Sequence, residues 1–348
     1  DFSFTNYDEA PRRLEAYRKL GARAEALLHE IGDEARPAFY QLVYYPLRGA
    51  ELMNRMTLGG QRNRWYARQG RAATNAVRDE VQRCYDSLQV ITRGYNSLLG
   101  GKWNHMDAAL AHAEEMIREG TAILDIGGES TRSGADEVSV HSELERVIPV
   151  IEALSARGLV VSVDTSKPEV MTAAAQVGAQ IINDVYALRR EGALEAAEKS
   201  GCGVCLMHMQ GEPRTMQKNP VYNDLMAEVK SFLAERAQAL RDLGVPAERI
   251  VLDPGFGFGK TVSQNFELLA KTEDFLSLGY PLLYGMSRKS SLGAVTGVAK
   301  AEERLISSVT AHLLAVERGA SIVRVHDVKQ MKEALTVYNA MIHYKDLK

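Results

Sequence analysis

The sequence predicts a parallel α/β barrel that follows an all-helical segment, with the boundary near residue 106. Before the boundary, apolar residues recur at helical spacing, and no alternating run is long enough for a strand. After it, short β-branched runs alternate with amphipathic helices, as in a parallel sheet wound by helices. The 348 residues, 45% of them hydrophobic, are enough for two domains. We therefore predict domains at 1–106 and 107–348.

Three helices are expected in the first domain, at 11–30, 37–56 and 61–91. Each carries apolar residues three or four positions apart, so we predict an antiparallel helical bundle. The aromatic residues of this segment suit either the bundle core or a surface on which sugars stack, and the spacing favours the core. They are Phe39, Tyr40, Tyr44, Tyr45, Trp65 and Tyr66.

Seven strands and eight helices are expected in the second domain. The strands are short apolar runs at 122–126, 160–164, 180–184, 203–208, 249–253, 281–286 and 321–325. The helices are expected near 107–119, 141–157, 169–177, 192–200, 224–243, 263–278, 300–319 and 327–344. Because a (β/α)8 barrel begins with a strand, one strand is missing or disguised.

Residues 88–92, LQVIT, are the candidate for this strand. They could pair as the first strand of the barrel, or they could continue the helical spacing of Val77, Val81 and Cys84, which is the favoured interpretation. A barrel that lacks its first strand exposes two sheet edges and leaves its interior layers incomplete.

Composition excludes several classes of protein. The net charge of −3, from 42 Lys and Arg against 45 Asp and Glu, argues against a nucleic-acid partner. The longest apolar runs fall far short of the roughly 18 residues that span a membrane, and the N-terminus does not resemble a signal peptide. Three cysteines are too few for a disulfide framework, so we expect a reducing, cytoplasmic location.

Polar residues stand at the ends of nearly all the predicted strands. In a parallel barrel these ends converge on one rim, where active sites are built. Capping of the following helix explains part of the pattern. It does not explain a set that combines hydrogen-bond acceptors with a basic cluster: Asp164, Asn183, Asp253, Lys289, Arg324 and His326.

This set of side chains suits a nitrogenous ring that bears phosphate. Carboxylates and an amide accept from the N–H groups of a heterocycle, while Lys, Arg and His bind phosphate. Glycines at 127–128 and in the loop 253–260 permit close backbone approach. That loop is not an ATP-binding Walker A motif, because Pro254 occupies the position of its first glycine.

Cys202, Cys205 and His208 could suggest a metal or redox site. No second ligand pair accompanies them, and alternate residues of a strand point to opposite faces. Packing in a buried strand is the favoured interpretation, and we expect no metal ligands among the site residues.

Seven ordered motifs over about 240 residues resemble those of the dihydropteroate synthase family. They are DIGGESTR at 125–132, VDTSKP at 163–168, IND at 182–184, LMHMQG at 206–211, DPGFGFGK at 253–260, GMSRKS at 285–290 and RVHDV at 324–328. The resemblance implies a TIM-barrel-like transferase of folate biosynthesis that condenses dihydropterin pyrophosphate with 4-aminobenzoate and releases pyrophosphate.

The resemblance also implies roles for individual residues. The pterin would be held by Asp164, Asn183, Asp253 and Lys289, with Met207 and Phe258 lining its pocket and Asp125 supporting it. Thr131, Arg132 and Ser290 would border the aminobenzoate. Arg324 and His326 would bind the pyrophosphate together with Mg²⁺, and a homodimer through the last helices is implied. Lys289, Arg324, His326 and Asp125 are the expected catalytic residues.

Two departures from the family pattern stand out. Ser133 and Gly134 replace a Pro-Gly pair beside the aminobenzoate pocket, so a rigid φ is lost. The family's first strand and its Asn-bearing loop are absent before Asp107. That loop supplies an Asn for magnesium and pyrophosphate, which places catalytic turnover in question.

A different resemblance covers residues 1–106. The stretches FYQLV at 39–43, NRWYARQGRA at 63–72 and GGKWNHM at 100–106 are similar to the helical region of family 115 glycoside hydrolases, the α-glucuronidases. The carboxylate-bearing barrel of that family is absent. The chain thus resembles a chimera, with two alternatives to an active synthase: a non-catalytic pterin-binding or scaffold fusion, or a carbohydrate-associated helical module with a passenger barrel.

Overall fold

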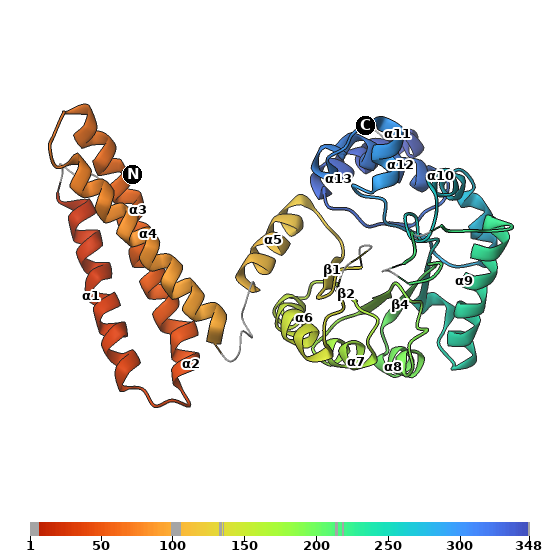
Figure 1. Ribbon diagram of the computed structural model, residues 1–348, viewed down its shortest axis with the longest axis horizontal. Coiled ribbons are helices and arrows are strands. Elements are labelled where there is room, and N and C mark those ends of the chain that lie inside the picture. Colours follow the sequence, from red (N-terminus) through yellow and green to blue (C-terminus); the bar gives the residue numbers. More distant parts are fainter. Residues whose placement is uncertain are drawn as a thin grey trace. The chain divides into compact units, whose positions relative to one another are not determined.

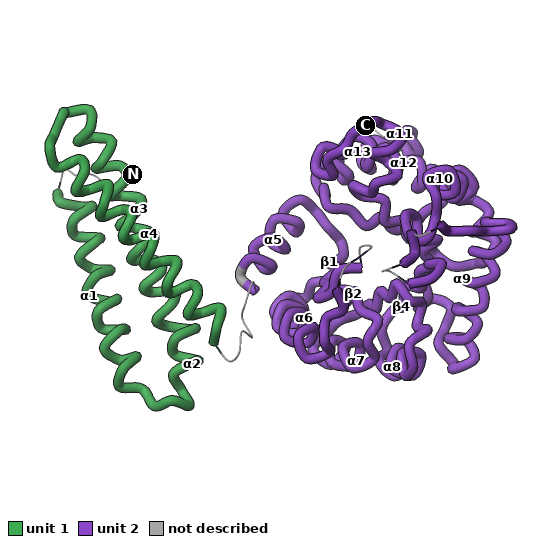
Figure 2. Tube along the Cα trace, in the orientation of Figure 1, with its two compact units in different colours: residues 1–105 green, residues 106–348 purple. Residues whose placement is uncertain are grey.

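The computed structural model describes residues 7–98, 106–131, 134, 136–212, 215–217 and 219–346. The chain divides into two compact units, residues 1–105 and residues 106–348 (Figure 2). None of the described helices combines the length and hydropathy needed to cross a bilayer.

The described part of the first unit is helical. It contains α1 (Glu9–Glu30), α2 (Arg36–Phe39), the π-helical turn η1 (Tyr40–Tyr44), α3 (Tyr45–Arg68) and α4 (Thr74–Ser97) (Figure 1). Its core holds Ala24, Tyr44, Leu52, Cys84 and Ile91, and Phe39, Tyr40 and Tyr45 pack against these side chains. These four aromatic residues therefore belong to the core, as the favoured interpretation has it.

Trp65 and Tyr66 have a different environment from the core aromatics. The Arg71 guanidinium lies over both rings, 5.4 Å from the Trp65 centroid and 4.8 Å from that of Tyr66. The pair of rings is thus held by a cation–π contact near the end of α3.

The predicted break between residues 56 and 61 is wrong, because α3 continues through Gly59 and Gly60 to Arg68. A Cβ at Gly59 would lie 2.7 Å from Val81 Cγ2, so this glycine permits the close approach of α3 and α4. The chain turns instead at Gly70, with φ of +63°. Residues 88–92 lie within α4, so the strand interpretation of LQVIT is wrong as well.

The second unit alternates helices with seven short parallel strands in its described residues. The strands are β1 (Leu124–Gly127), β2 (Val161–Asp164), β3 (Ile181–Asp184), β4 (Gly203–Met207), β5 (Ile250–Asp253), β6 (Leu283–Tyr284) and β7 (Ile322–Val323). The helices are α5 (Met106–Glu119), α6 (Val140–Ser155), α7 (Pro168–Gln176), α8 (Ala193–Ser200), α9 (Leu225–Asp242), α10 (Val262–Ala270), α11 (Ser290–Thr296), α12 (Leu305–Glu317) and α13 (Val328–Ile342). All seven strands begin and end within two residues of their predicted limits.

The helical prediction needs three corrections in the second unit. The helix expected at 300–319 is the 3₁₀ turn η5 (Ala301–Glu303) followed by α12, which begins at Leu305. The helix expected at 263–278 is α10 followed by the 3₁₀ segment η4 (Thr272–Leu278). Helix α11, which starts directly after Lys289, was not expected from the sequence. Its seven residues include only a few apolar positions, too few for a clear helical period.

The strands follow one another around the sheet in chain order. β1 to β5 form a continuous parallel sheet, β6 pairs with β7, and a parallel bridge from Leu252 to Leu282 joins the two groups. Among the described residues, no strand lies between β7 and β1. Helices encircle the sheet (Figure 1), and α5 contacts both α6 and α13, so the outer layer is continuous beside that interval.

The main core of the second unit lies between the strands and the surrounding helices. It includes Val161, Val163, Ile182, Leu206 and Leu252, each fully buried. Burial of each such side chain stabilises the fold by about 1.5–3 kcal/mol. Strands that are buried on both faces place their carboxyl ends at fixed positions, and those ends carry the polar residues described next.

Candidate active site

Four predicted site residues meet at one rim of the barrel. Asn183 Nδ2, on β3, donates to Asp125 Oδ2 of β1 over 3.1 Å. Arg324, which follows β7, donates from Nε to the same Asp125 oxygen over 2.5 Å and from Nη2 to Asp164 Oδ2 over 2.9 Å. The parallel register places Asp164 beside Asn183, and Arg324 then joins Asp164 to Asp125.

Burial and the neighbouring charges shift the pKa values of this cluster. Burial, together with the nearby Asp125 carboxylate, raises the pKa of Asp164 to about 7, although Arg324 opposes the rise. Burial lowers the pKa of Arg324, but the two carboxylates more than offset this and raise it overall. Asp164 can therefore hold or release a proton near neutral pH while Arg324 stays charged.

A second group of site residues lies around the glycine-rich loop after β5: Asp253 ends β5, and Lys289 reaches the loop from the start of α11. Asp253 Oδ1 accepts from the Gly255 N–H over 2.7 Å, and burial raises the pKa of this carboxyl group. Lys289 donates to the Phe256 carbonyl, and its Nζ lies 4.1 Å from the centroid of the Phe258 ring. Burial lowers the pKa of Lys289 to about 7.

Gly257 is needed where the loop passes Lys289. Its φ is +83°, and a Cβ there would lie 2.7 Å from Lys289 Cδ. Any larger residue would therefore strain the backbone and displace the lysine.

The residues expected to line the pterin pocket also lie together. Met207 at the end of β4 belongs to an apolar cluster with Val185 and Met209, and Phe258 packs against that cluster. Thr131 and Asp164 line a cavity of about 520 Å³. Arg132 lies outside the described residues.

His326 and Ser290 occupy the part of the rim after β6 and β7. His326 Nδ1 lies 2.9 Å from Ser287 Oγ, and the neighbouring Arg288 forms a two-point ion pair with Asp327. Ser290 is the first residue of α11 and is exposed.

Lys260, the last residue of the glycine-rich loop, lies beside the site. From the sequence alone, no role was predicted for it there. Its buried Nζ lies 2.9 Å from the Gly255 carbonyl, 3.0 Å from the Phe258 carbonyl and 3.0 Å from His208 Nδ1. Burial lowers the pKa of Lys260 well below its usual value, and burial beside Lys260 lowers that of His208 to about 2. Lys260 thus holds both ends of the loop that carries Phe256 and Phe258.

The donor set of the described residues does not fit a resident divalent metal. No three His, Cys, Asp or Glu side chains converge among them, and Asp125 and Asp164 already share the Arg324 guanidinium. Cys202 and Cys205 are buried free thiols, Cys202 Sγ donates to the Ala179 carbonyl, and His208 is bonded to Lys260. These three residues pack the interior around β4.

Comparison with known proteins identifies the second unit. The family model described as "Pterin binding enzyme" matches residues 96–326. The dihydropteroate synthase of Escherichia coli strain K12 is 50% identical over 250 residues, which cover 72% of this chain and 88% of that protein. The chain belongs to the dihydropteroate synthase family.

Solved structures of that family agree with the fold. The Xanthomonas albilineans dihydropteroate synthase with 4-aminobenzoic acid has a TM-score of 0.66 at 50% identity, covering 70% of this chain and 88% of that one. The same enzyme in complex with 7,8-dihydropteroate has a TM-score of 0.63 at 48% identity, covering 68% and 88%. The second unit is therefore a TIM-barrel-like transferase of the folate-biosynthesis class.

Proposed function

We propose that this chain condenses dihydropterin pyrophosphate with 4-aminobenzoate to give dihydropteroate and pyrophosphate. The observation that carries the proposal is the convergence of Asp125, Asp164 and Asn183 with Arg324, close to the loop that bears Asp253. The names of the relatives and the ligands of the solved structures support the same substrates.

In this proposal the pterin ring lies against the acceptors of the rim. Asp164, Asn183 and Asp253 accept from its N–H groups, and Lys289 donates to its ring acceptors. Met207 and Phe258 cover the ring, and Asp125 supports Asn183 through their hydrogen bond. For the ring to bind Asp164, the hydrogen bond from Arg324 to Asp164 must lengthen or break.

The chemical step is a displacement at the pterin methylene. The amine nitrogen of 4-aminobenzoate attacks this carbon, the C–O bond breaks, and pyrophosphate leaves with the bonding electrons while the amine loses a proton. Arg324 and His326 stabilise the charge that develops on the leaving group. Thr131, Arg132 and Ser290 border the incoming aminobenzoate.

Mg²⁺ enters the proposal only through its chemistry: when bound with the substrate, it would help to neutralise the charge of the pyrophosphate. The described side chains do not form a cage for it, as their donor set shows. No step of the proposed reaction is therefore assigned to the metal.

Replacement of Lys289 tests this function. Lys289→Ala removes the ammonium group that lies over Phe258 and faces Asp253, so we expect dihydropteroate formation to fall by at least about 100-fold. Lys300→Ala is the matched control, because Lys300 is an exposed lysine paired with Glu303. Undiminished turnover in Lys289→Ala would contradict the role given to this lysine.

A non-catalytic pterin-binding protein is the second candidate. One observation favours it: among the described residues no strand fills the interval between β7 and β1, where the family's first strand and its loop are expected. Pterin binding without any product in the turnover assay would establish this candidate.

We further propose that the chain is a chimera. A synthase barrel without its first strand would follow a helical segment related to family 115 glycoside hydrolases, with the domains at 1–106 and 107–348. Support comes from the extent of the relatives, which match 72% of the chain, and from the separate compactness of the helical unit. Trp65 and Tyr66 are the side chains that a carbohydrate-associated module would offer.

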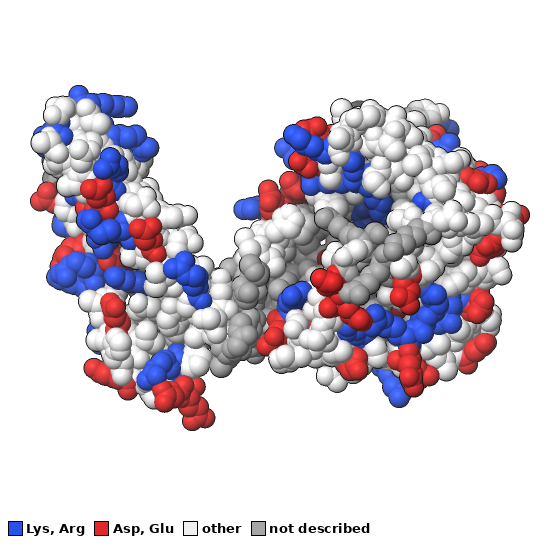
Figure 3. All heavy atoms as spheres, in the orientation of Figure 1, with Lys and Arg blue, Asp and Glu red and all other residues white. Residues whose placement is uncertain are grey.

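We also propose that the chain forms a homodimer through its last two helices. α12 and α13 expose Ile306, Val337, Met341 and Ile342, each at least 48% accessible. No nucleic-acid partner is proposed, because the chain carries a net charge of −3. On the visible face of the second unit, acidic side chains lie beside the basic ones (Figure 3). Three buried free thiols suit a reducing compartment, the cytoplasm.

A further inference from the structure

A buried lysine links two glutamates beside the loop that joins β1 to α6, of which the structure describes residues 128–131, 134 and 136–139. Lys167 Nζ donates to Glu129 Oε2 over 2.6 Å and also to Glu143 Oε2. The Lys167 side chain is 5% exposed and that of Glu143 is fully buried. We call Glu129, Lys167 and Glu143 the buried triad.

The triad fastens both ends of the β1–α6 loop. Glu129 stands at the start of the loop, and its Oε1 accepts from the Val138 N–H at the far end over 2.8 Å. The next residue, Ser139, caps α6 by accepting from the Ser142 N–H, and α6 carries Glu143. Lys167 therefore connects the start of the loop to the helix that follows it.

The space around Gly128 fixes the same arrangement. A Cβ at Gly128 would lie 2.8 Å from Glu143 Cγ and 2.9 Å from Val147 Cγ1, so only glycine fits against the helix. The Gly128 carbonyl accepts from Arg146 Nη1 over 2.7 Å. Loop and helix are thus in direct contact at the level of the triad.

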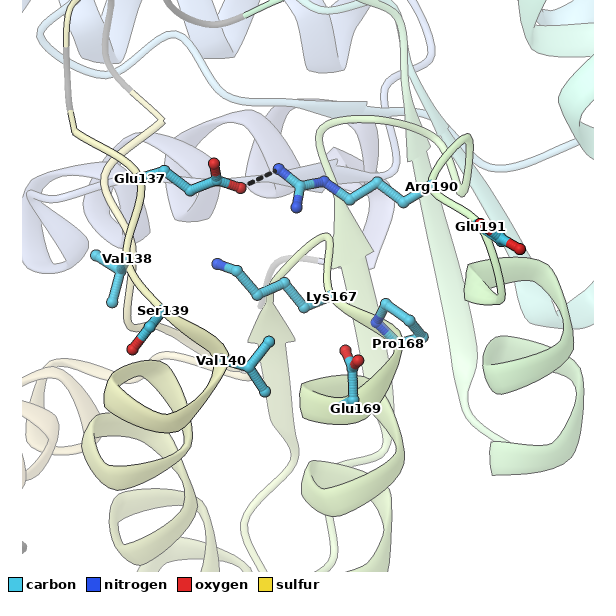
Figure 4. A pocket seen from close by; sticks show the side chains of 9 residues that line it. All are labelled: Glu137, Val138, Ser139, Val140, Lys167, Pro168, Glu169, Arg190 and Glu191. Atoms are coloured by element: carbon cyan, nitrogen blue, oxygen red, sulfur yellow. Dashed lines mark hydrogen bonds and ion pairs between the residues drawn. The ribbon is translucent and has the colours of Figure 1, made fainter.

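The described parts of the loop line two neighbouring cavities, and Glu137 and Arg190 line both of them. Glu129 and Thr131 line the cavity of about 520 Å³ that contains Asp164, on the substrate side of the rim. Val138 and Lys167 line a second cavity of about 570 Å³ (Figure 4). Figure 4 shows the Lys167 side chain extending toward Val138, beside the ion pair between Glu137 and Arg190.

The charges of the triad point to a positioning role. Two carboxylates share one ammonium group, and Glu143 Oε1 has no hydrogen-bond partner among the described residues. A buried ion cluster with one unsatisfied carboxylate oxygen contributes little to the net stability of the fold. The role that fits the buried triad is to fix the positions of the segments that it joins. Although burial lowers the pKa of Lys167, its hydrogen bonds to both glutamates raise it overall, so the lysine is charged.

We propose that the buried triad is a positioning device that holds the described ends of the β1–α6 loop, residues 128–131 and 136–139, beside the substrate cavity and thereby sets the affinity for the second substrate, the aromatic amine. This inference rests on the proposed function. The triad touches no reacting atom in that scheme. Its loss should weaken aminobenzoate binding and leave the pterin residues Asn183, Asp253 and Lys289 in place.

Lys167→Met and Lys167→Arg in the full chain test the proposal. We expect Lys167→Met to raise KM for 4-aminobenzoate by at least about tenfold, with the Kd of dihydropterin pyrophosphate changed by less than about threefold. Lys167→Arg keeps the positive charge, so its KM for 4-aminobenzoate should stay close to that of the parent protein. Lys271→Met, which removes an exposed lysine paired with Glu267, is the control and should match the parent protein.

A folded Lys167→Met protein with an unchanged KM, or with KM and Kd raised together, would overturn the proposal. If Lys167→Met does not fold, Glu129→Gln replaces it, because the amide still accepts from Val138 while the charge is lost. Amide hydrogen exchange at Val138 gives a readout that needs no turnover. Faster exchange in Lys167→Met supports the positioning role even if the parent protein makes no dihydropteroate, and unchanged exchange refutes it.

Discussion

Arg324 and Asp125 are 199 positions apart in the sequence, yet the Arg324 guanidinium donates to the Asp125 carboxylate over 2.5 Å. The contact joins the residue that follows β7 to β1, across the interval in which the described residues contain no strand. A second bond from Arg324 reaches Asp164 on β2. Arg324 therefore links the two edges of the sheet as well as serving the proposed anion site.

The raised pKa of Asp164 predicts a pH dependence of stability. Its pKa rises from 3.8 to about 7 in the folded protein, so between these values the folded state binds more protons than the unfolded state. The free energy of unfolding should therefore fall as the pH rises from about 4 to about 7.

The Asn side chain of the Asp164→Asn variant cannot ionise. The free energy of unfolding of this variant should therefore fall less than that of the parent protein between about pH 4 and pH 7. Urea denaturation at several pH values measures the difference. Part of the fall should remain, because burial also raises the pKa of Asp184 to about 6. Identical pH profiles for the variant and the parent protein would contradict the raised pKa of Asp164.

Lys260→Met should destabilise the second unit and weaken pterin binding. The substitution leaves His208 Nδ1 and the carbonyls of Gly255 and Phe258 without their shared partner. We expect a loss of about 3 kcal/mol in the free energy of unfolding, measured by denaturant titration. Lys300→Met should change it by less than about 0.5 kcal/mol. A Lys260→Met protein as stable as this control would refute the proposed anchoring of the loop.

Gly59→Leu tests whether the helical unit contributes to pterin binding. The new side chain collides with Val81 on α4, which should destabilise the first unit by about 1–3 kcal/mol. If the barrel is independent of the first unit, its pterin affinity should stay unchanged. Thermal denaturation should then show the unfolding transition of the first unit at a lower temperature. Lost pterin binding would show that the helical segment completes the barrel.

Val337→Glu should convert the proposed homodimer to a monomer. Val337 is 71% exposed on α13, near other exposed apolar side chains of that helix, and a buried unpaired carboxylate in an interface is strongly unfavourable. Light scattering of the parent protein and the variant measures the change in mass. A parent protein that is already monomeric would remove the basis for the proposed interface.

The strands and the rim were predictable because local signals determine them. Val161 and Ile182 lie in apolar runs whose ends carry Asp164 and Asn183, and parallel pairing brings such ends together without further information. The motifs around these residues then identified the family from the residues alone.

Other features depend on contacts that sequence spacing does not reveal. The sequence predicted a break between residues 56 and 61, but the close approach of Gly59 to Val81 makes Gly59 a packing residue within α3. Lys260 and Lys167 are buried by segments distant in the sequence, so nothing in their local surroundings marks them as anchors. The pairing of Arg324 with two carboxylates, in place of the phosphate expected for it, depends on how closely the fold brings β7 to β1 and β2.

Titration calorimetry of the full chain with dihydropterin pyrophosphate, with and without magnesium, decides whether this rim is a working pterin site. We expect binding with a Kd of about 1 μM, and Arg324→Ala should weaken it by at least about tenfold, because the guanidinium both links the sheet edges and faces the leaving group. No heat of binding from the folded parent protein would mean that the motifs of the dihydropteroate synthase family are present without an assembled pocket.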